Sequence, residues 1–343
     1  MRIVLELLKE NILNNVKNIH DRVKKPIIAV VKANAYGMGS VEVSSVLERS
    51  PHVKSFAVAC LEEAIELREA GIKKPILVLG GMLSQECSKE LIHYNITPVV
   101  SSLYQFDILK DKNIDFHVKI DTGMGRLGFF ELLEDIKNHP NLKGIMTHLA
   151  SPLDKAYSTF QIEKFRHILK ALNKNDIEIH LQSSAGLLYD LDFTTAVRIG
   201  LAIYGEKPYE DFDIPISPIY RFKAKVISLK AFKKGDKISY GGTYTLDKDG
   251  VIGVASIGYA DGVPKSLANR WYFDFNGAKL PMVGAVTMDM TMFKLPDNVD
   301  IKIGDYVDFV NQDITFSKAS KIVKTIPYEL MCRVGKRVKR LVV

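Results

Sequence analysis

Cysteine is scarce in this sequence, and long apolar runs are missing from it. The 343 residues include three scattered cysteines, Cys60, Cys87 and Cys332, with no CxxC pair. Such a set excludes a disulfide framework and lacks the ligands of a structural zinc site. No stretch approaches the roughly 18 uninterrupted apolar residues of a membrane-spanning helix, and Lys9 and Glu10 interrupt the N-terminal segment too early for a signal peptide. We therefore expect a cytoplasmic protein without membrane or metal partners.

The body of the chain also has little net charge, although the whole chain is basic. Its 47 basic and 40 acidic residues give a net charge of +7. Six of these charges lie after residue 320, where seven basic side chains accompany a single acidic one, Glu329. A nucleic-acid-binding protein would interleave basic and aromatic residues over its body, and this pattern is missing. We expect no nucleic-acid partner and a solvated basic tail.

Short β-branched apolar runs alternate with amphipathic segments over the first 200 residues. Eight such runs occur, at 26–31, 55–59, 75–79, 96–100, 116–120, 142–147, 177–181 and 195–199. This alternation predicts an α/β fold, either a (β/α)8 TIM-type barrel or an open doubly wound sheet, and the number of units favours the barrel. From about Arg221 the pattern changes to short strands with turn signals. We predict a barrel over residues 1–217 and a C-terminal mostly-β domain over residues 218–343.

Polar or glycine-rich loops follow several of the expected barrel strands. They occupy residues 32–39, 119–128, 147–151, 182–186 and 198–205. Because barrel enzymes carry their chemistry at the carboxyl ends of their strands, these loops are expected to meet at one site.

Lys32 ends the first of these strands and is the best candidate for a reactive group. A lysine at the end of a buried strand loses solvation, which lowers its pKa and frees a neutral amine for carbonyl chemistry. Taken alone, it could instead keep its ammonium group in water. Hydrogen-bond donors suited to a phosphate are Tyr36, four residues after Lys32, and Ser183, Ser184 and the backbone of Gly200 and Leu201, which follow other strands. An amine beside a phosphate cradle points to pyridoxal 5'-phosphate, whereas no nucleotide-binding motif is present.

Six motifs together resemble the pyridoxal-phosphate-dependent alanine racemases. They are VVKANAYGMGS, DTGMGRLG, VRIGLAIYG, ISYGGTYTL, IGYADGVP and VGAVTMDM, in the family's order, and the resemblance extends from Lys32 to Tyr328. It implies interconversion of L- and D-alanine, which supplies D-alanine for peptidoglycan. It also implies a barrel and a β-domain in a head-to-tail homodimer, in which each β-domain contributes to the partner's active site.

The resemblance assigns one catalytic residue to each face of the substrate. It implies that Lys32 holds the cofactor and exchanges protons on one face of the α-carbon. One group returns a proton mostly to the face it came from, so racemisation needs a second group opposite. Tyr240 matches the family's second base, supplied across the dimer interface. A tyrosine with a reference pKa of about 10 needs cationic support, and His148 and Arg198 resemble that supporting network. Alone, His148 would equally fit an ordinary histidine at a strand end.

The resemblance also assigns cations to the cofactor ring. Arg198 would face the pyridine nitrogen, where it keeps its charge and cannot accept the ring proton, which makes the ring a weaker electron sink. Arg126 resembles the arginine that contacts the cofactor's phenolic oxygen and the substrate carboxylate. Lys119 matches a lysine that is often carbamylated and orients that arginine, although it could be an ordinary ion-pairing lysine.

The remaining matches concern the phosphate and the edge of the substrate pocket. Tyr328 resembles the tyrosine that contacts the phosphate, and the backbone of Met288 with Asp289 resembles the edge supplied by the partner. Tyr259 resembles a residue of the access channel, or is simply an aromatic of the β-domain.

Two departures from the family leave alternatives open. Ser183 and Thr287 replace the usual asparagine and cysteine, so Ser184 alone keeps its match in that pair. The change at residue 287 leaves a broader racemase, for example one that accepts serine, as an alternative. A pyridoxal-phosphate-binding homeostasis protein built from a barrel alone is a further alternative, but it would lack the β-domain and Tyr240.

Overall fold

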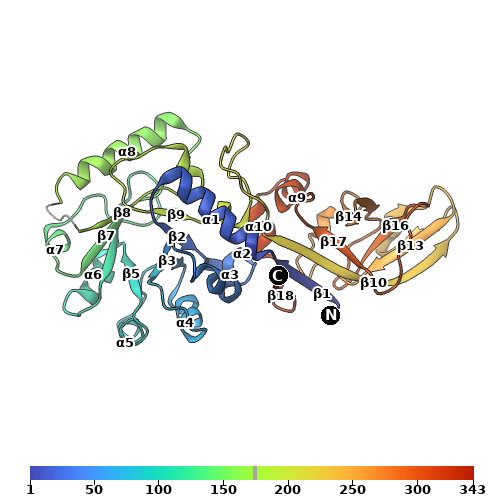
Figure 1. The fold of residues 1–343 in the computed structure, drawn as a ribbon, viewed down its shortest axis with the longest axis horizontal. Helices are drawn as coiled ribbons and strands as arrows, with labels where there is room; N and C mark the ends of the chain where they lie inside the picture. The colour runs from blue at the N-terminus through green and yellow to red at the C-terminus, as the bar shows by residue number, and fades with distance from the viewer. Residues whose placement is uncertain (173–175) are drawn as a thin grey trace.

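The computed structural model describes residues 1–172 and 176–343, which form two domains side by side (Figure 1). The first is a ring of eight parallel strands in the order β8-β7-β6-β5-β4-β3-β2-β9. These strands are β2 (Ile27–Val30), β3 (Val53–Val58), β4 (Ile76–Val78), β5 (Thr97–Val100), β6 (Phe116–Lys119), β7 (Leu142–Met146), β8 (Glu178–His180) and β9 (Val197–Ile199). A parallel bridge between His180 and Ala196 joins the two ends of the sheet. The barrel prediction is confirmed, and the open-sheet alternative is wrong.

The barrel strands are almost continuously apolar because both of their faces are covered. All four residues of β2 are buried, as are all four of β6. Helices cover the outside of the ring (Figure 1). They are α1 (Lys9–Val23), α3 (Ser40–Leu47), α4 (Leu61–Glu69), α5 (Cys87–His93), α6 (Leu103–Leu109), α7 (Glu134–Lys137) and α8 (Lys155–Leu169). Three short segments, α2 (Lys32–Tyr36) and the 3₁₀ helices η1 (Ala185–Leu188) and η2 (Leu201–Tyr204), instead follow β2, β8 and β9 at the carboxyl ends of these strands. None of the helices in the described ranges is long and apolar enough to cross a membrane.

The second domain is mostly β and is organised around one long strand. That strand, β10 (Tyr220–Phe232), runs from the junction into the second domain and pairs with β1, β13 and β17 (Figure 1). The elements of this domain are β1 (Ile3–Leu7), β11 (Lys237–Ile238), η3 (Tyr240–Gly242), β12 (Tyr244–Thr245), β13 (Gly250–Ala255), η4 (Lys265–Leu267), β14 (Tyr272–Phe275), β15 (Ala278–Pro281), β16 (Thr291–Leu295), β17 (Tyr306–Val310), α9 (Phe316–Val323), α10 (Pro327–Cys332) and β18 (Lys339–Val342).

The first strand of the chain belongs to this second sheet. Residues 3–7 pair with β10 on one side and with β18 on the other, whereas the sequence-based division assigned residues 1–217 to the barrel. Ile3, Leu5 and Leu7 are buried, and the strand supplies hydrogen bonds to β10, whose backbone groups would otherwise face solvent. The two ends of the chain therefore lie next to each other at the domain junction (Figure 1).

The basic C-terminal segment is bound to the body of the protein, so the expectation of a solvated tail is wrong. The Arg340 guanidinium donates to the carbonyl oxygens of Gly37, at 2.8 Å, and Val334, at 3.2 Å. Arg337 forms ion pairs with Asp261 and Asp289. These arginines have partners because the pairing of β1 with β18 draws the segment back onto both domains.

Candidate active site

A cavity of about 630 Å³ opens at the carboxyl ends of the barrel strands and gathers most of the predicted site residues. Ten of them line it, together with the further candidate phosphate donor Ser183: Lys32, Tyr36, Lys119, Arg126, His148, Ser184, Arg198, Gly200, Leu201 and Tyr328. The residues come from many separate loops and from α10 in the second domain. Sequence reasoning missed Cys332 as a lining residue, because a lone cysteine on a short helix carries no signal of its neighbours.

A left-handed turn directs Lys32 into this cavity. Four consecutive residues after it, from Ala33 to Tyr36, have φ between 52° and 55°. Such backbone costs about 1–2 kcal/mol per residue, so neighbouring groups must hold it. The Glu63 carboxylate accepts from the Ala33 backbone N–H at 2.6 Å, and the Asn34 side chain accepts from the backbone of Ser40 at 2.8 Å.

The environment of Lys32 favours a neutral amine. Burial lowers the pKa of the Lys32 ammonium, and the nearby cations Arg126 and Arg198 lower it further. The same three influences act on Lys119, where burial is again the largest, and bring its pKa to about 8. Two amines whose charged forms are disfavoured by burial and by neighbouring cations therefore face the same cavity.

A second part of the cavity presents neutral hydrogen-bond donors. Burial raises the pKa of the Tyr36 phenol and brings that of Tyr328 to about 12, so both keep their O–H groups. The Tyr36 hydroxyl lies so close to Gly200 that a Cβ there would be 2.3 Å from it. The Ser184 hydroxyl accepts from the Ala202 backbone N–H at 3.1 Å, which leaves its own hydrogen free to donate. The donors and the first turn of η2 suit a phosphate group.

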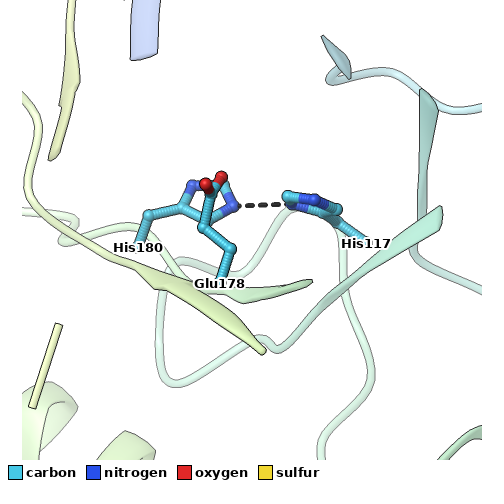
Figure 2. Close-up of side chains that lie close together, drawn as sticks. All are labelled: His117, Glu178 and His180. Carbon is cyan, nitrogen blue, oxygen red and sulfur yellow. Dashed lines mark hydrogen bonds between the residues drawn. The ribbon is translucent and has the colours of Figure 1, made fainter. Parts of the chain in front are cut away.

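Arg198 anchors a chain of hydrogen bonds across the inside of the barrel. Its guanidinium donates to Nδ1 of His180 at 2.8 Å and to Nδ1 of His148 at 2.9 Å. A guanidinium only donates, so both Nδ1 atoms accept and both histidines carry their proton on Nε2. Nε2 of His180 then donates to Nδ1 of His117 at 2.9 Å (Figure 2). Burial lowers the pKa of Arg198 to about 10, so it stays charged at neutral pH.

His117 and His180 were not predicted as site residues. Each is a polar residue inside an apolar barrel strand, and that pattern was the available signal. Together with Glu178 they offer ligand atoms within 4.8 Å of one another (Figure 2). A metal ion would need the lone pair of His180 Nε2 while Arg198 already uses the one on Nδ1, which would require an imidazolate beside a fixed cation. The donor chemistry therefore favours a hydrogen-bond chain over a metal site.

The buried histidines predict a steep loss of stability in mild acid. Burial lowers the pKa of His117 to about 4 and that of His148 to about 3, from an unfolded value near 6.5. Between pH 6.5 and 4 the unfolded chain therefore binds more protons, so stability falls as the pH falls. Each such histidine contributes about 1.4 kcal/mol per pH unit to this slope.

We expect His117→Gln to flatten that slope by roughly the contribution of one histidine. Urea unfolding at several pH values between 6.5 and 4.5 measures it. The exposed His167, on α8, provides the control variant His167→Gln, which should leave the slope as it is. A slope that is identical in wild type and His117→Gln would contradict the assignment of a buried neutral imidazole.

The loop that carries Arg126 is held by a buried aspartate. The Asp121 carboxylate accepts from the backbone N–H groups of Gly123, Gly125 and Arg126 at 2.9–3.1 Å. Burial alone would raise the pKa of this carboxyl, but the backbone donors outweigh it and lower the pKa. The loop therefore has a fixed shape that places Arg126 at the rim of the cavity.

Four predicted residues lie on the β-domain, away from the cavity of their own chain. Tyr240 begins η3 and is 78% exposed, and Tyr259 and Met288 are about half exposed. Asp289 is paired with Arg337. None of these four residues is among the side chains that line the barrel cavity.

Comparison with known proteins agrees with this architecture. The alanine racemase N-terminal domain model matches residues 8–208, and the alanine racemase C-terminal domain model matches residues 219–342. The alanine racemase of Aquifex pyrophilus is 49% identical over all of this chain and 98% of that protein, and that of Aquifex aeolicus is 47% identical over 100% and 99%.

Solved structures give the same result. An alanine racemase of Clostridium difficile 630 superposes with a TM-score of 0.92 at 31% identity, covering 100% of this chain and 96% of that one. An alanine racemase from Bartonella henselae with covalently bound pyridoxal phosphate superposes with a TM-score of 0.90 at 27% identity over the whole of both chains. The chain described here belongs to the alanine racemase family.

Proposed function

We propose that this protein interconverts L- and D-alanine with pyridoxal 5'-phosphate as cofactor, and that it supplies D-alanine for peptidoglycan in the cytoplasm. The observation that carries the proposal is one cavity in which the Lys32 amine, the Arg198 guanidinium and a set of phosphate-type donors face one another. Membership of the alanine racemase family supports it, as does the covalently bound pyridoxal phosphate of the Bartonella henselae relative.

The residues present fit the cofactor. The Lys32 amine would hold its aldehyde carbon, and Tyr36, Ser184, Tyr328 and the backbone of Gly200 and Leu201 would hold its phosphate. The missing Cβ at Gly200 leaves the space that the Tyr36 hydroxyl needs. When bound, the cofactor withdraws electrons from the substrate's α-carbon and so acidifies its proton. Arg198 faces the cavity as a charged donor that cannot give up its proton at neutral pH.

Two side chains would move the proton, one on each face of the substrate. The Lys32 amine is neutral enough to accept a proton because burial and two neighbouring cations disfavour its charged form. Tyr240 would serve the opposite face from the second subunit. Because Arg198 occupies Nδ1 of His148, the Nε2–H of His148 is a fixed donor that can stabilise a tyrosinate oxygen placed beside it.

A homodimer with shared active sites is part of this proposal, and exposed apolar residues on both domains support it. On the barrel domain, exposed apolar side chains include Leu127, which lines the cavity, and Phe130, Leu153 and Phe160. On the second domain, Tyr240, Tyr259, Met288 and Met290 are exposed as well. Exposed apolar side chains on both domains suit a two-fold arrangement in which the barrel of one subunit meets the β-domain of the other.

The direct test is incubation with L-alanine and pyridoxal phosphate, followed by chiral chromatography for D-alanine. Failure of the wild-type holoenzyme to form D-alanine would overturn the proposal. A parallel assay with L-serine measures the breadth of substrate specificity. We expect serine to be the poorer substrate, because the Thr287 hydroxyl donates within its own loop, to the Met290 carbonyl at 2.9 Å. A barrel-only homeostasis protein does not fit a chain with this β-domain.

Lys119 is expected to carry a carbamate. Its pKa of about 8 leaves a substantial fraction of neutral amine at physiological pH, which is the form that reacts with carbon dioxide. The change converts a cation beside Arg126 into an anion, and so turns repulsion into attraction. Intact mass measured in bicarbonate buffer should show an acid-labile addition that Lys119→Ala removes. A mass that corresponds only to the unmodified amine would contradict this expectation.

A further inference from the structure

Three segments that are distant in sequence meet around the buried carboxylate of Asp261. Arg2 donates to Oδ1 from Nη2 at 2.9 Å, and Arg337 donates to the same oxygen from Nε at 2.7 Å. The Gly258 backbone N–H donates to Oδ2 at 2.9 Å. The side chain of Asp261 is fully buried, so its charge depends on these partners. Arg2 near the N-terminus and Arg337 in the C-terminal segment therefore both contact the loop of residues 256–262.

Arg337 also joins this loop to a second one, residues 287–290. Its Nη2 lies 2.6 Å from Oδ1 of Asp289, while its Nε remains on Asp261. The two loops are also bonded directly, through the Tyr259 backbone N–H to Thr287 at 2.9 Å and the Ala260 N–H to Met288 at 3.1 Å. A Cβ at Gly258 would lie 2.3 Å from the Thr287 carbonyl oxygen, so the loops pack backbone against backbone.

This paired unit carries Tyr259, which resembles a residue of the access channel, and Met288 with Asp289, which resemble the pocket edge supplied by the partner. Tyr259 and Met288 are about half exposed, and Asp289 faces Arg337. The direct loop contacts hold the backbone near residues 259 and 288, but Arg337 supplies the bond to the Asp289 side chain. A planar guanidinium can bind two carboxylates at once, whereas a lysine ammonium on its flexible stem cannot reproduce that fork.

We infer that Arg337 is a positioning residue, which clamps the 256–262 and 287–290 loops so that Met288 and Asp289 form an ordered edge for the substrate pocket of the partner subunit. The inference rests on the proposed function and extends it to a residue of the basic tail. Arg337 acts through these loops and touches neither Lys32 nor Tyr240, so its loss weakens substrate binding more than proton transfer.

The test compares Arg337→Ala and Arg337→Lys with Lys336→Ala, which removes one charge from the neighbouring exposed residue. We expect Arg337→Ala to raise the KM for alanine about ten-fold and to change kcat by less than about three-fold. Arg337→Lys should give an intermediate KM, and Lys336→Ala should match wild type. Amide hydrogen exchange of peptides that cover 256–262 and 287–290 should be faster in Arg337→Ala alone.

A second variant keeps the inference testable if Arg337→Ala fails to fold. Asp289→Ala leaves the pair of Arg337 with Asp261 intact and removes its ion pair with the second loop, whose backbone still accepts from Arg2 at 3.3 Å. Exchange should therefore speed up at 287–290 and not at 256–262. Unchanged exchange in these variants, or a KM equal to that of Lys336→Ala, overturns the inference. If wild type makes no D-alanine, the proposed function fails, and the exchange data alone still decide whether Arg337 clamps the loops.

Discussion

Replacing Lys32 with alanine is expected to lower the rate of alanine racemisation by about 10³-fold or more. The amine has two duties in the proposed mechanism, because it holds the cofactor and carries the proton on one face. Its position at the end of β2, before a strained left-handed turn, is fixed by Glu63 and Asn34. The measurement is kcat from D-alanine formation, together with the absorbance spectrum of bound cofactor.

A matched control lies at the other end of the same strand. Lys25 precedes β2, is partly buried, and has a pKa that burial lowers, as for Lys32. Its ammonium donates to the Thr194 hydroxyl at 2.7 Å, at the opposite mouth of the barrel. Lys25→Ala should lose some stability and keep kcat, because it removes a buried lysine without touching the site. Equal loss of kcat in the two variants, or a Lys32→Ala protein that still binds cofactor covalently, would contradict the role given to Lys32.

The sequence carried enough information for the barrel because its signal is local. Each strand is a short, fully apolar run, and each is followed by an amphipathic segment, so the ring of β2 to β9 could be predicted. The placement of β1 could not, since its apolar pattern fits either sheet and only its pairing with β10 and β18 decides between them. The prediction of a solvated C-terminal segment was wrong for the same reason, because the partners of Arg337 and Arg340 are 76 and 303 residues away in the sequence.

The candidate site also has one part that could be predicted from the sequence and one part that could not. Residues at strand ends converge by topology alone, which is why ten of the predicted groups line one cavity. The contacts deeper inside the barrel, below the strand ends, depend on the register between strands. His117 on β6 meets His180 on β8 across the barrel interior, and no spacing in the sequence relates these two positions. The left-handed turn after Lys32 was also unpredictable, because alanine and tyrosine have no preference for positive φ.

Tyr240→Phe is expected to reduce racemisation by about 10²–10⁴-fold while sparing the proton exchange on the face served by Lys32. With Lys32 intact, the α-proton of one enantiomer should still exchange with deuterated solvent, and the product should keep its original configuration. NMR of each enantiomer in deuterium oxide measures this exchange, and chiral chromatography measures racemisation. Tyr244, an aromatic residue of the neighbouring β12, provides the control variant Tyr244→Phe, which should retain turnover. Equal loss of exchange from both enantiomers in Tyr240→Phe would remove the two-face assignment.

The exposed position of Tyr240 makes a stronger prediction about subunits. Lys32→Ala and Tyr240→Phe proteins should each be inactive, yet their mixture should regain activity once subunits reassort. Half of the dimers formed from equal amounts are mixed, and each mixed dimer has one site with both groups intact, so about a quarter of wild-type activity should return. If Tyr240 served its own chain, each site would lack one group and no activity would return. Because Tyr240 is 78% exposed and lies outside the cavity of its own chain, we expect recovery.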